Sequence, residues 1–125
     1  MITKMPELQS LWDQSLGDPG ICIAVLDGPV DRYHPCFDGA NLTQMQTLVS
    51  GVANQGSASQ HGTHVASVIF GQQGSSVLGI APGCRGLLLP IFQDGKGDGL
   101  APCSQIDLAR AITQAVEAGA NIINN

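Results

Sequence analysis

The chain has 125 residues, of which 43% are hydrophobic and 12% charged, and these proportions are typical of a single globular domain. Its formal net charge of −5, with only five Lys and Arg residues, argues against a surface that binds nucleic acid. No apolar run reaches the ~18 residues of a membrane span. The N-terminus also lacks the apolar stretch of a secretory signal, so we expect a cytoplasmic protein with no membrane partner.

The first part of the chain predicts a helix, a buried strand, a weak strand and a second helix. Pro6 and the apolar residues that follow it at helical spacing predict a short helix. The continuously apolar run Ile21–Leu26 is typical of a strand that is buried on both faces of a parallel sheet. A weak strand is expected over Thr47–Val52. After a polar loop over residues 54–60, we expect an apolar, buried helix over His61–Phe70.

The second part of the chain predicts a strand, a helix and a further strand. Leu87–Phe92 is apolar and predicts a second buried strand. A glycine-rich loop over Asp94–Pro102 leads to a helix that Ser104 caps and Gly119 ends. Ala120–Ile123 predicts a third buried strand. Strands that alternate with helices predict an α/β fold in which helices flank a parallel β-sheet.

The cysteines do not form a metal-binding pattern. They are Cys22, Cys36, Cys84 and Cys103. No CxxC pair and no His/Cys cluster has the spacing of a zinc site, so no metal ligands are predicted. The missing secretory signal favours free thiols in a reducing compartment, with disulfides as the alternative.

An acid and a histidine stand where an α/β protein gathers its functional groups. Asp27 directly follows the strand Ile21–Leu26, and the carboxyl ends of parallel strands are where such groups meet. His61 begins the next predicted helix, and Gly62 leaves room beside it. A carboxylate can orient an imidazole, which then takes a proton from a hydroxyl nucleophile. The alternatives are a strand-end cap for Asp27 and, for His64, packing or hydrogen bonding within the helix.

Four segments carry a resemblance to a known family. They are Asp27 after its apolar strand, the motif HGTHVA at 61–66, GIAP at 79–82 and ANIIN at 120–124. In this order they resemble the N-terminal half of a subtilisin-like serine protease, in which the catalytic Asp precedes the His. The resemblance implies that residues 1–125 are the N-terminal portion of the peptidase domain. It also implies that Asp27 and His61 are catalytic, and that the nucleophilic Ser and the oxyanion Asn lie in a C-terminal portion beyond this chain.

A narrower resemblance involves further motifs. LDGPVD at 26–31, HPCF at 34–37, IFGQ at 69–72, CRG at 84–86 and PIF at 90–92 resemble the subtilases that process ribosomal precursor peptides in cyanobactin-type biosynthesis. One kind of these proteases removes the leader, and the other joins the ends of the core peptide into a macrocycle. The macrocyclising kind adds a helical insertion between the Asp and the His. The interval from Asp27 to His61 leaves little room for it, which favours leader removal.

The chain also departs from the family pattern. Most subtilases carry Ser or Thr after the catalytic Asp, whereas this chain has Gly28. The family's structural calcium site often takes a carboxylate from the position occupied here by Cys36, and the loop Gln72–Val77 contains no acid. Since a strong calcium site needs several hard oxygens, we expect no structural calcium and no other cofactor.

The sequence therefore predicts a serine endopeptidase of the Asp-His-Ser type that cleaves a ribosomal precursor peptide. Its expected partners are the peptide substrate and a complementary C-terminal segment of the same protease, and this chain alone is expected to be inactive. The alternative is a truncated pseudoprotease that acts as a peptide-binding or interaction module. A nucleotide-binding domain is disfavoured because neither a P-loop nor GxGxxG is present.

Overall fold

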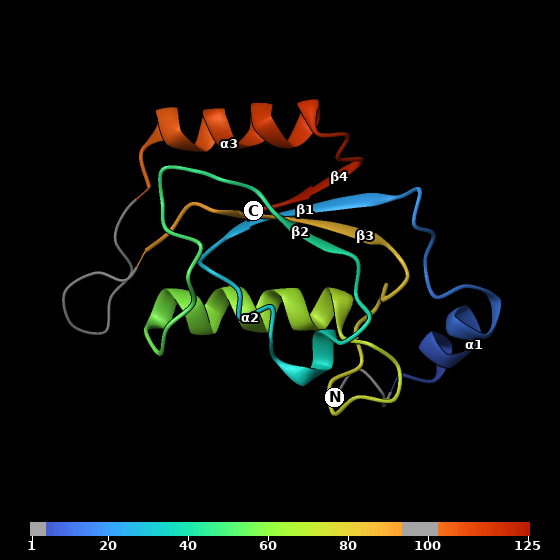
Figure 1. Cartoon of the computed structure of the whole chain (residues 1–125). Helices are drawn as coiled ribbons and strands as arrows, with labels where there is room; N and C mark the ends of the chain where they lie inside the picture. The colour runs from blue at the N-terminus through green and yellow to red at the C-terminus, as the bar shows by residue number, and fades with distance from the viewer. Residues whose placement is uncertain (1–4, 94–102) are drawn as a thin grey trace.

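The part of the chain that the structure describes, residues 5–93 and 103–125, folds into a four-stranded parallel sheet with helices on both faces (Figure 1). The structure is a computed structural model. Its strands are β1 (Cys22–Asp27), β2 (Leu42–Gln44), β3 (Arg85–Pro90) and β4 (Ile122–Asn124). They lie in the order β2-β3-β1-β4, and each neighbouring pair is parallel. The α/β fold with a parallel sheet is therefore confirmed.

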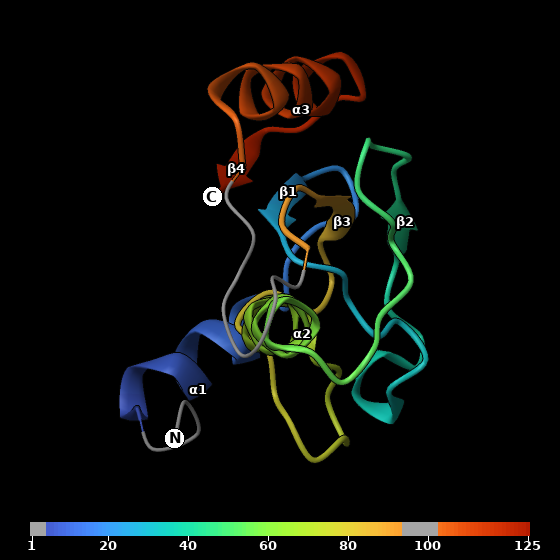
Figure 2. The ribbon, with the colours of Figure 1, turned by 90° about the vertical axis from the view of Figure 1, so that its left-hand side faces the viewer.

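One helix covers each face of the sheet, and a further helix lies beyond one end of it. The helices are α1 (Pro6–Gln14), the 3-10 helix η2 (Pro35–Phe37), α2 (Ser57–Phe70) and α3 (Gln105–Glu117). Figure 2 shows α2 on one face of the sheet and α3 on the other. The helix α1 lies beyond one end of the sheet, where the indole N–H of Trp12 donates to the carbonyl oxygen of Ile80 at 3.0 Å. None of the helices in the described residues has the length and apolar character needed to cross a membrane.

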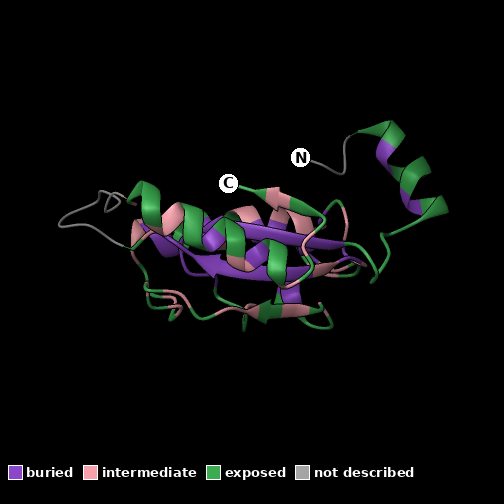
Figure 3. Cartoon of the chain, turned by 90° about the horizontal axis from the view of Figure 1, so that it is seen from above, coloured by how far each residue is buried: buried purple, intermediate pink, exposed green. Residues whose placement is uncertain are grey.

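Two apolar cores lie on the two faces of β1, because successive side chains of a strand point to opposite faces of a sheet. The core under α2 includes Ile23, Val25, Ala66 and Phe70. The core under α3 includes Cys22, Ala24, Leu26, Ala111 and Ala115. Figure 3 shows that β1 and β3 are buried while the outer side of α3 is exposed. Coverage on both faces explains why this strand has an unbroken apolar sequence.

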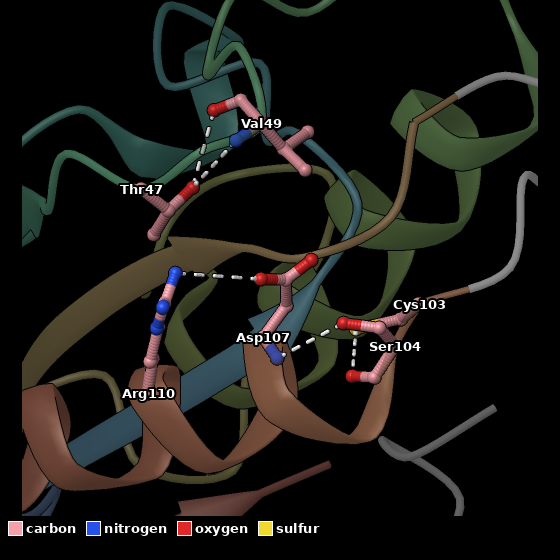
Figure 4. A network of polar contacts seen from close by, with 6 residues as sticks. All are labelled: Thr47, Val49, Cys103, Ser104, Asp107 and Arg110. Atoms are coloured by element: carbon pink, nitrogen blue, oxygen red, sulfur yellow. Dashed lines mark hydrogen bonds and ion pairs between the residues drawn. The ribbon is translucent and has the colours of Figure 1, made fainter.

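The second half of the chain follows its prediction closely. The hydroxyl oxygen of Ser104 accepts the backbone N–H of Asp107 at 3.1 Å and so caps α3 (Figure 4). Gly119 follows the helix with a positive φ of 96°, a conformation that favours glycine. The strand predicted at Leu87–Phe92 begins and ends two residues earlier, at Arg85–Pro90. The predicted loop Asp94–Pro102 lies outside the described residues.

The weak strand predicted at Thr47–Val52 is wrong. The short strand in this region is β2, at Leu42–Gln44, and residues 47–52 form a loop. The Thr47 hydroxyl lies 3.1 Å from the carbonyl oxygen of Val49 (Figure 4). It also lies 2.5 Å from the carbonyl oxygen of Pro90, to which it donates. These contacts fold the segment back on itself, so its β-branched residues do not join the sheet.

The helix predicted at His61–Phe70 begins four residues earlier, at Ser57. The polar stretch 54–60 is therefore partly helical, and His61 lies in the second turn of α2. The N-cap residue Gly56 makes no side-chain capping bond, so the sequence contained no capping signal for this helix.

The C-terminal strand differs from its prediction in burial. The strand predicted at Ala120–Ile123 is β4, and it pairs with β1 on one side only. Ile122 is 51% exposed and Ile123 is half-buried. Among the described residues β4 lies at the edge of the sheet, so the full burial expected for this strand stays a prediction.

Candidate active site

The structure brings Asp27 and His61 into direct contact. Asp27 is the last residue of β1 and is 6% exposed, whereas the His61 side chain on α2 is 60% exposed. The His61 Nδ1 atom lies 2.8 Å from Asp27 Oδ1. Because a carboxylate oxygen only accepts hydrogen bonds, Nδ1 carries the proton in this contact, and in the neutral ring Nε2 then has none. An unprotonated Nε2 on an exposed ring can accept a proton from a hydroxyl group.

The same carboxylate oxygen has a second partner that the sequence did not reveal. The backbone N–H of Gly28 donates to Asp27 Oδ1 at 2.7 Å. This bond holds the buried carboxylate in one orientation while Oδ1 faces His61. Because every residue except proline supplies a backbone N–H, no sequence motif could have predicted its role.

Close packing between β1 and α2 makes this contact possible. A Cβ atom added to Gly62 would lie 2.3 Å from the carbonyl oxygen of Gly28 and 2.7 Å from that of Pro29. Only glycine fits such an approach without moving the backbone. The expectation that Gly62 leaves room for neighbouring backbone is confirmed.

A second contact ties the loop after β1 to the helix that carries His61. The hydroxyl oxygen of Thr63 accepts the backbone N–H of Asp31 at 2.9 Å. The Asp31 side chain is exposed and accepts the backbone N–H of Tyr33 at 3.2 Å. Asp31 is therefore a turn residue, and Thr63 of the HGTH motif links the two segments.

The other two histidines lie apart from the Asp27–His61 contact. The ring Nδ1 of His34 accepts the backbone N–H of Cys36 at 3.1 Å and caps η2. His64 is exposed on α2 and shares a cavity of about 390 Å³ with Asp31 and His34. No group of three His, Cys, Asp or Glu side chains among the described residues is arranged to hold a metal ion.

The cysteines are free thiols, three of them buried: Cys22, Cys36 and Cys84. Burial raises the pKa of the Cys36 thiol, and the negative charge of Asp31 adds to the rise. Burial and the charge of Asp107 raise the pKa of Cys103 in the same direction. These thiols are held in the protonated form, which is the less reactive one.

The loop that would face a structural calcium ion, Gln72–Val77, has no acidic side chain to bind the ion. Cys36 is 1% exposed and belongs to the core under α2. The side-chain N–H groups of Gln72 donate to the carbonyl oxygens of Phe70 and Pro82, each at 2.9 Å. Calcium prefers several oxygens that are free to face it, and charged ones above all. Neither Cys36 nor the loop Gln72–Val77 supplies a carboxylate oxygen.

The chain is similar to known proteins. The model of the subtilase family, Peptidase_S8, matches residues 18–125. The chain is 33% identical over 115 residues to the thermophilic serine proteinase of Bacillus sp. (strain AK1), an alignment that covers 90% of this chain and 27% of that protein.

Two solved structures are also similar. The prenylagaramide maturation protease PagA has 56% identity and a TM-score of 0.80, covering 96% of this chain and 39% of that chain. The PatG macrocyclase in complex with peptide has 30% identity and a TM-score of 0.77, covering 97% of this chain and 46% of that one. The chain spans less than a third of the length of the curated relatives that it matches.

Proposed function

Because the chain belongs to the subtilase family, we propose that it forms part of a serine endopeptidase in which Asp27 and His61 serve a nucleophilic serine of the complete protease. The single observation that carries this proposal is the 2.8 Å contact between His61 Nδ1 and Asp27 Oδ1. An exposed histidine with no chemical task would not need a buried carboxylate partner to fix its tautomer.

The proposed mechanism assigns one task to each of the two side chains. Asp27 fixes the His61 tautomer and stabilises the imidazolium that forms during the reaction. His61 Nε2 takes the proton of the serine hydroxyl as the serine attacks the peptide carbonyl. It then gives this proton to the leaving amine. In the second step it takes a proton from the water that attacks the ester bond of the acyl-enzyme, and it returns this proton to the departing serine oxygen.

We propose that the substrate is a ribosomal precursor peptide and that the reaction removes its leader. The proposal is supported by the 56% identity to the prenylagaramide maturation protease, against 30% identity to the PatG macrocyclase. The segment between β1 and α2 also supports it, since it contains only the 3-10 helix Pro35–Phe37 and the three-residue strand Leu42–Gln44.

We propose further that a complementary segment of the same protease covers the open side of the sheet. Ile122 of the edge strand β4 is 51% exposed, and Ile106, Ile112 and Val116 of α3 are exposed as well. An uncovered apolar sheet edge is a site of aggregation, which gives a physical reason for a cover. Monomeric, cooperative unfolding of residues 1–125 alone, measured by size exclusion and circular dichroism, would contradict this part of the proposal.

A cytoplasmic location is also part of the proposal. The four free thiols support it, because extracellular proteins tend to oxidise such residues to disulfides.

Mass spectrometry of a precursor peptide tests the proposed reaction. The complete protease should release the leader by cutting one peptide bond, and in H₂¹⁸O the new carboxyl group should carry one ¹⁸O atom. A cyclic product would indicate macrocyclisation instead. Binding without cleavage would favour the alternative of a pseudoprotease.

A further inference from the structure

The end of β1 lies directly against the first turn of α2. A Cβ atom added to Gly28 would lie 2.0 Å from the carbonyl oxygen of Ala58 and 2.5 Å from its carbonyl carbon. Real Cβ atoms essentially never approach a neighbour closer than 3.0 Å. Both neighbours are backbone atoms, which cannot rotate away as a side chain can. Any side chain at position 28 would therefore push the start of α2 away by about 1 Å or more, because protein interiors are close-packed.

These two backbone segments carry the two side chains of the candidate site. Gly28 directly follows Asp27, and Ala58 lies three residues before His61 on the same helix. A displacement of the first turn of α2 would thus reach His61. The present Nδ1–Oδ1 distance is 2.8 Å. An increase of about 1 Å would exceed the ~3.2 Å limit of a hydrogen bond.

Gly28 acts on the acid as well as on the helix. Its backbone N–H donates at 2.7 Å to Asp27 Oδ1, the same oxygen that contacts His61. A shift of the backbone at Gly28 would change both hydrogen bonds of this oxygen together.

We propose that Gly28 is a positioning residue for the Asp27–His61 pair. Its missing side chain allows α2 to pack on β1 closely enough for the two groups to meet, and its N–H orients the carboxylate. In this chain the close approach of the Ala58 carbonyl group leaves no room for a Cβ atom at position 28. The catalytic meaning of this inference rests on the proposed function, since the pair it positions is the general base and its partner.

Kinetics of the complete protease give the first test. We expect Gly28→Ala and Gly28→Ser to lower kcat about 100-fold, because a misplacement of about 1 Å at a reacting group has that effect. KM should stay within about twofold of the original value, since Gly28 acts on the general base and not on peptide binding. The matched control is Gly20→Ala, where the nearest neighbour of the new Cβ atom is a movable side-chain oxygen of Asp18 at 3.1 Å. Unchanged kcat in both Gly28 variants would overturn the proposal.

NMR gives a second test that needs no turnover. The Nδ1–H proton of His61 should give a low-field resonance in the unsubstituted protease and in Gly20→Ala, and this resonance should be lost in the Gly28 variants. Its retention in folded Gly28 variants would contradict the proposal. Peptide hydrolysis by the unsubstituted protease tests the proposed function separately.

A measurement on the unsubstituted protein decides the matter if the variants do not fold. The amide proton of Gly28 should shift in step with the titration of His61, because both groups contact the same oxygen. A Gly28 amide resonance that does not shift when His61 is protonated would refute the proposed link between Gly28 and the Asp27–His61 pair.

Discussion

Replacing Asp27 by Asn in the complete protease removes a negative charge beside His61 and preserves the shape of the side chain. In the structure one oxygen, Oδ1, lies 2.7 Å from the Gly28 nitrogen and 2.8 Å from His61 Nδ1. Because the Gly28 N–H needs an acceptor, the new carboxamide should keep its oxygen at this position. That oxygen can still accept the Nδ1–H of His61, so we expect the same tautomer and the loss of only the attraction between charges.

The distance and the exposure set the size of this effect. Two unit charges about 4 Å apart attract by about 4 kcal/mol at an effective dielectric constant of about 20, and by about 1 kcal/mol in water. The Asp27 side chain is 8% exposed and that of His61 is 60% exposed, so the value lies between these limits. The transition state should lose about 1 to 4 kcal/mol, which lowers kcat about 5-fold to 1,000-fold.

Steady-state kinetics on a precursor peptide would measure this change, with Asp38→Asn as a control because Asp38 is an exposed acid away from the pair. KM should be nearly unchanged, and the Nδ1–H resonance of His61 should persist. A fall in kcat of about 10⁴-fold, the size expected from a wrong tautomer, together with loss of that resonance would refute the reasoning.

Three further predictions concern stability. Phe70→Ala should lower the free energy of unfolding by about 3 to 5 kcal/mol in a urea titration, because this fully buried ring packs against Gly86; a loss below about 1 kcal/mol would contradict the packing. Burial raises the pKa of the Cys36 thiol above its ordinary value of 9.0. The contribution of this thiol to the free energy of unfolding is therefore complete below pH 9.0 and is lost as the pH rises above that value. Cys36→Ala should therefore flatten the decline of Tm above pH 9.0, and an unaltered slope would argue against this. Calcium should not raise Tm through residues 72–77, and an ion found there at ~2.3–2.6 Å from its oxygens would show the opposite.

Two kinds of element could be predicted from the sequence: those with a local signal, such as a helix cap, and strands that helices cover on both faces. Cys22–Leu26 is apolar throughout because α2 and α3 cover both faces of β1, whereas a strand with one face in water would alternate apolar and polar residues. The capping signal of Ser104 also appears in the structure as predicted. The strand predicted at Thr47–Val52 was wrong because the Thr47 hydroxyl donates a hydrogen bond to the carbonyl oxygen of Pro90, which is distant in the sequence. Composition cannot reveal such a contact.

The two side chains of the candidate site could be predicted from the sequence, but the backbone contacts that position them could not. Asp27 and His61 could be paired from the carboxyl end of a strand and from the HGTH motif. The donor Gly28 N–H and the close approach of Ala58 depend on how α2 docks against β1. That docking is a tertiary property, so the sequence presented Gly28 only as a departure from the family pattern.

Labelling with a fluorophosphonate probe tests the central claim most directly, namely that Asp27 and His61 activate a serine hydroxyl. In the complete protease we predict that mass spectrometry will find one labelled serine outside residues 1–125. His61→Ala should abolish the labelling, while His64→Ala, an exposed histidine on the same helix, should retain it. Absence of labelling, labelling at a serine of α2 such as Ser59 or Ser67, or equal labelling of the His61→Ala variant would contradict the account.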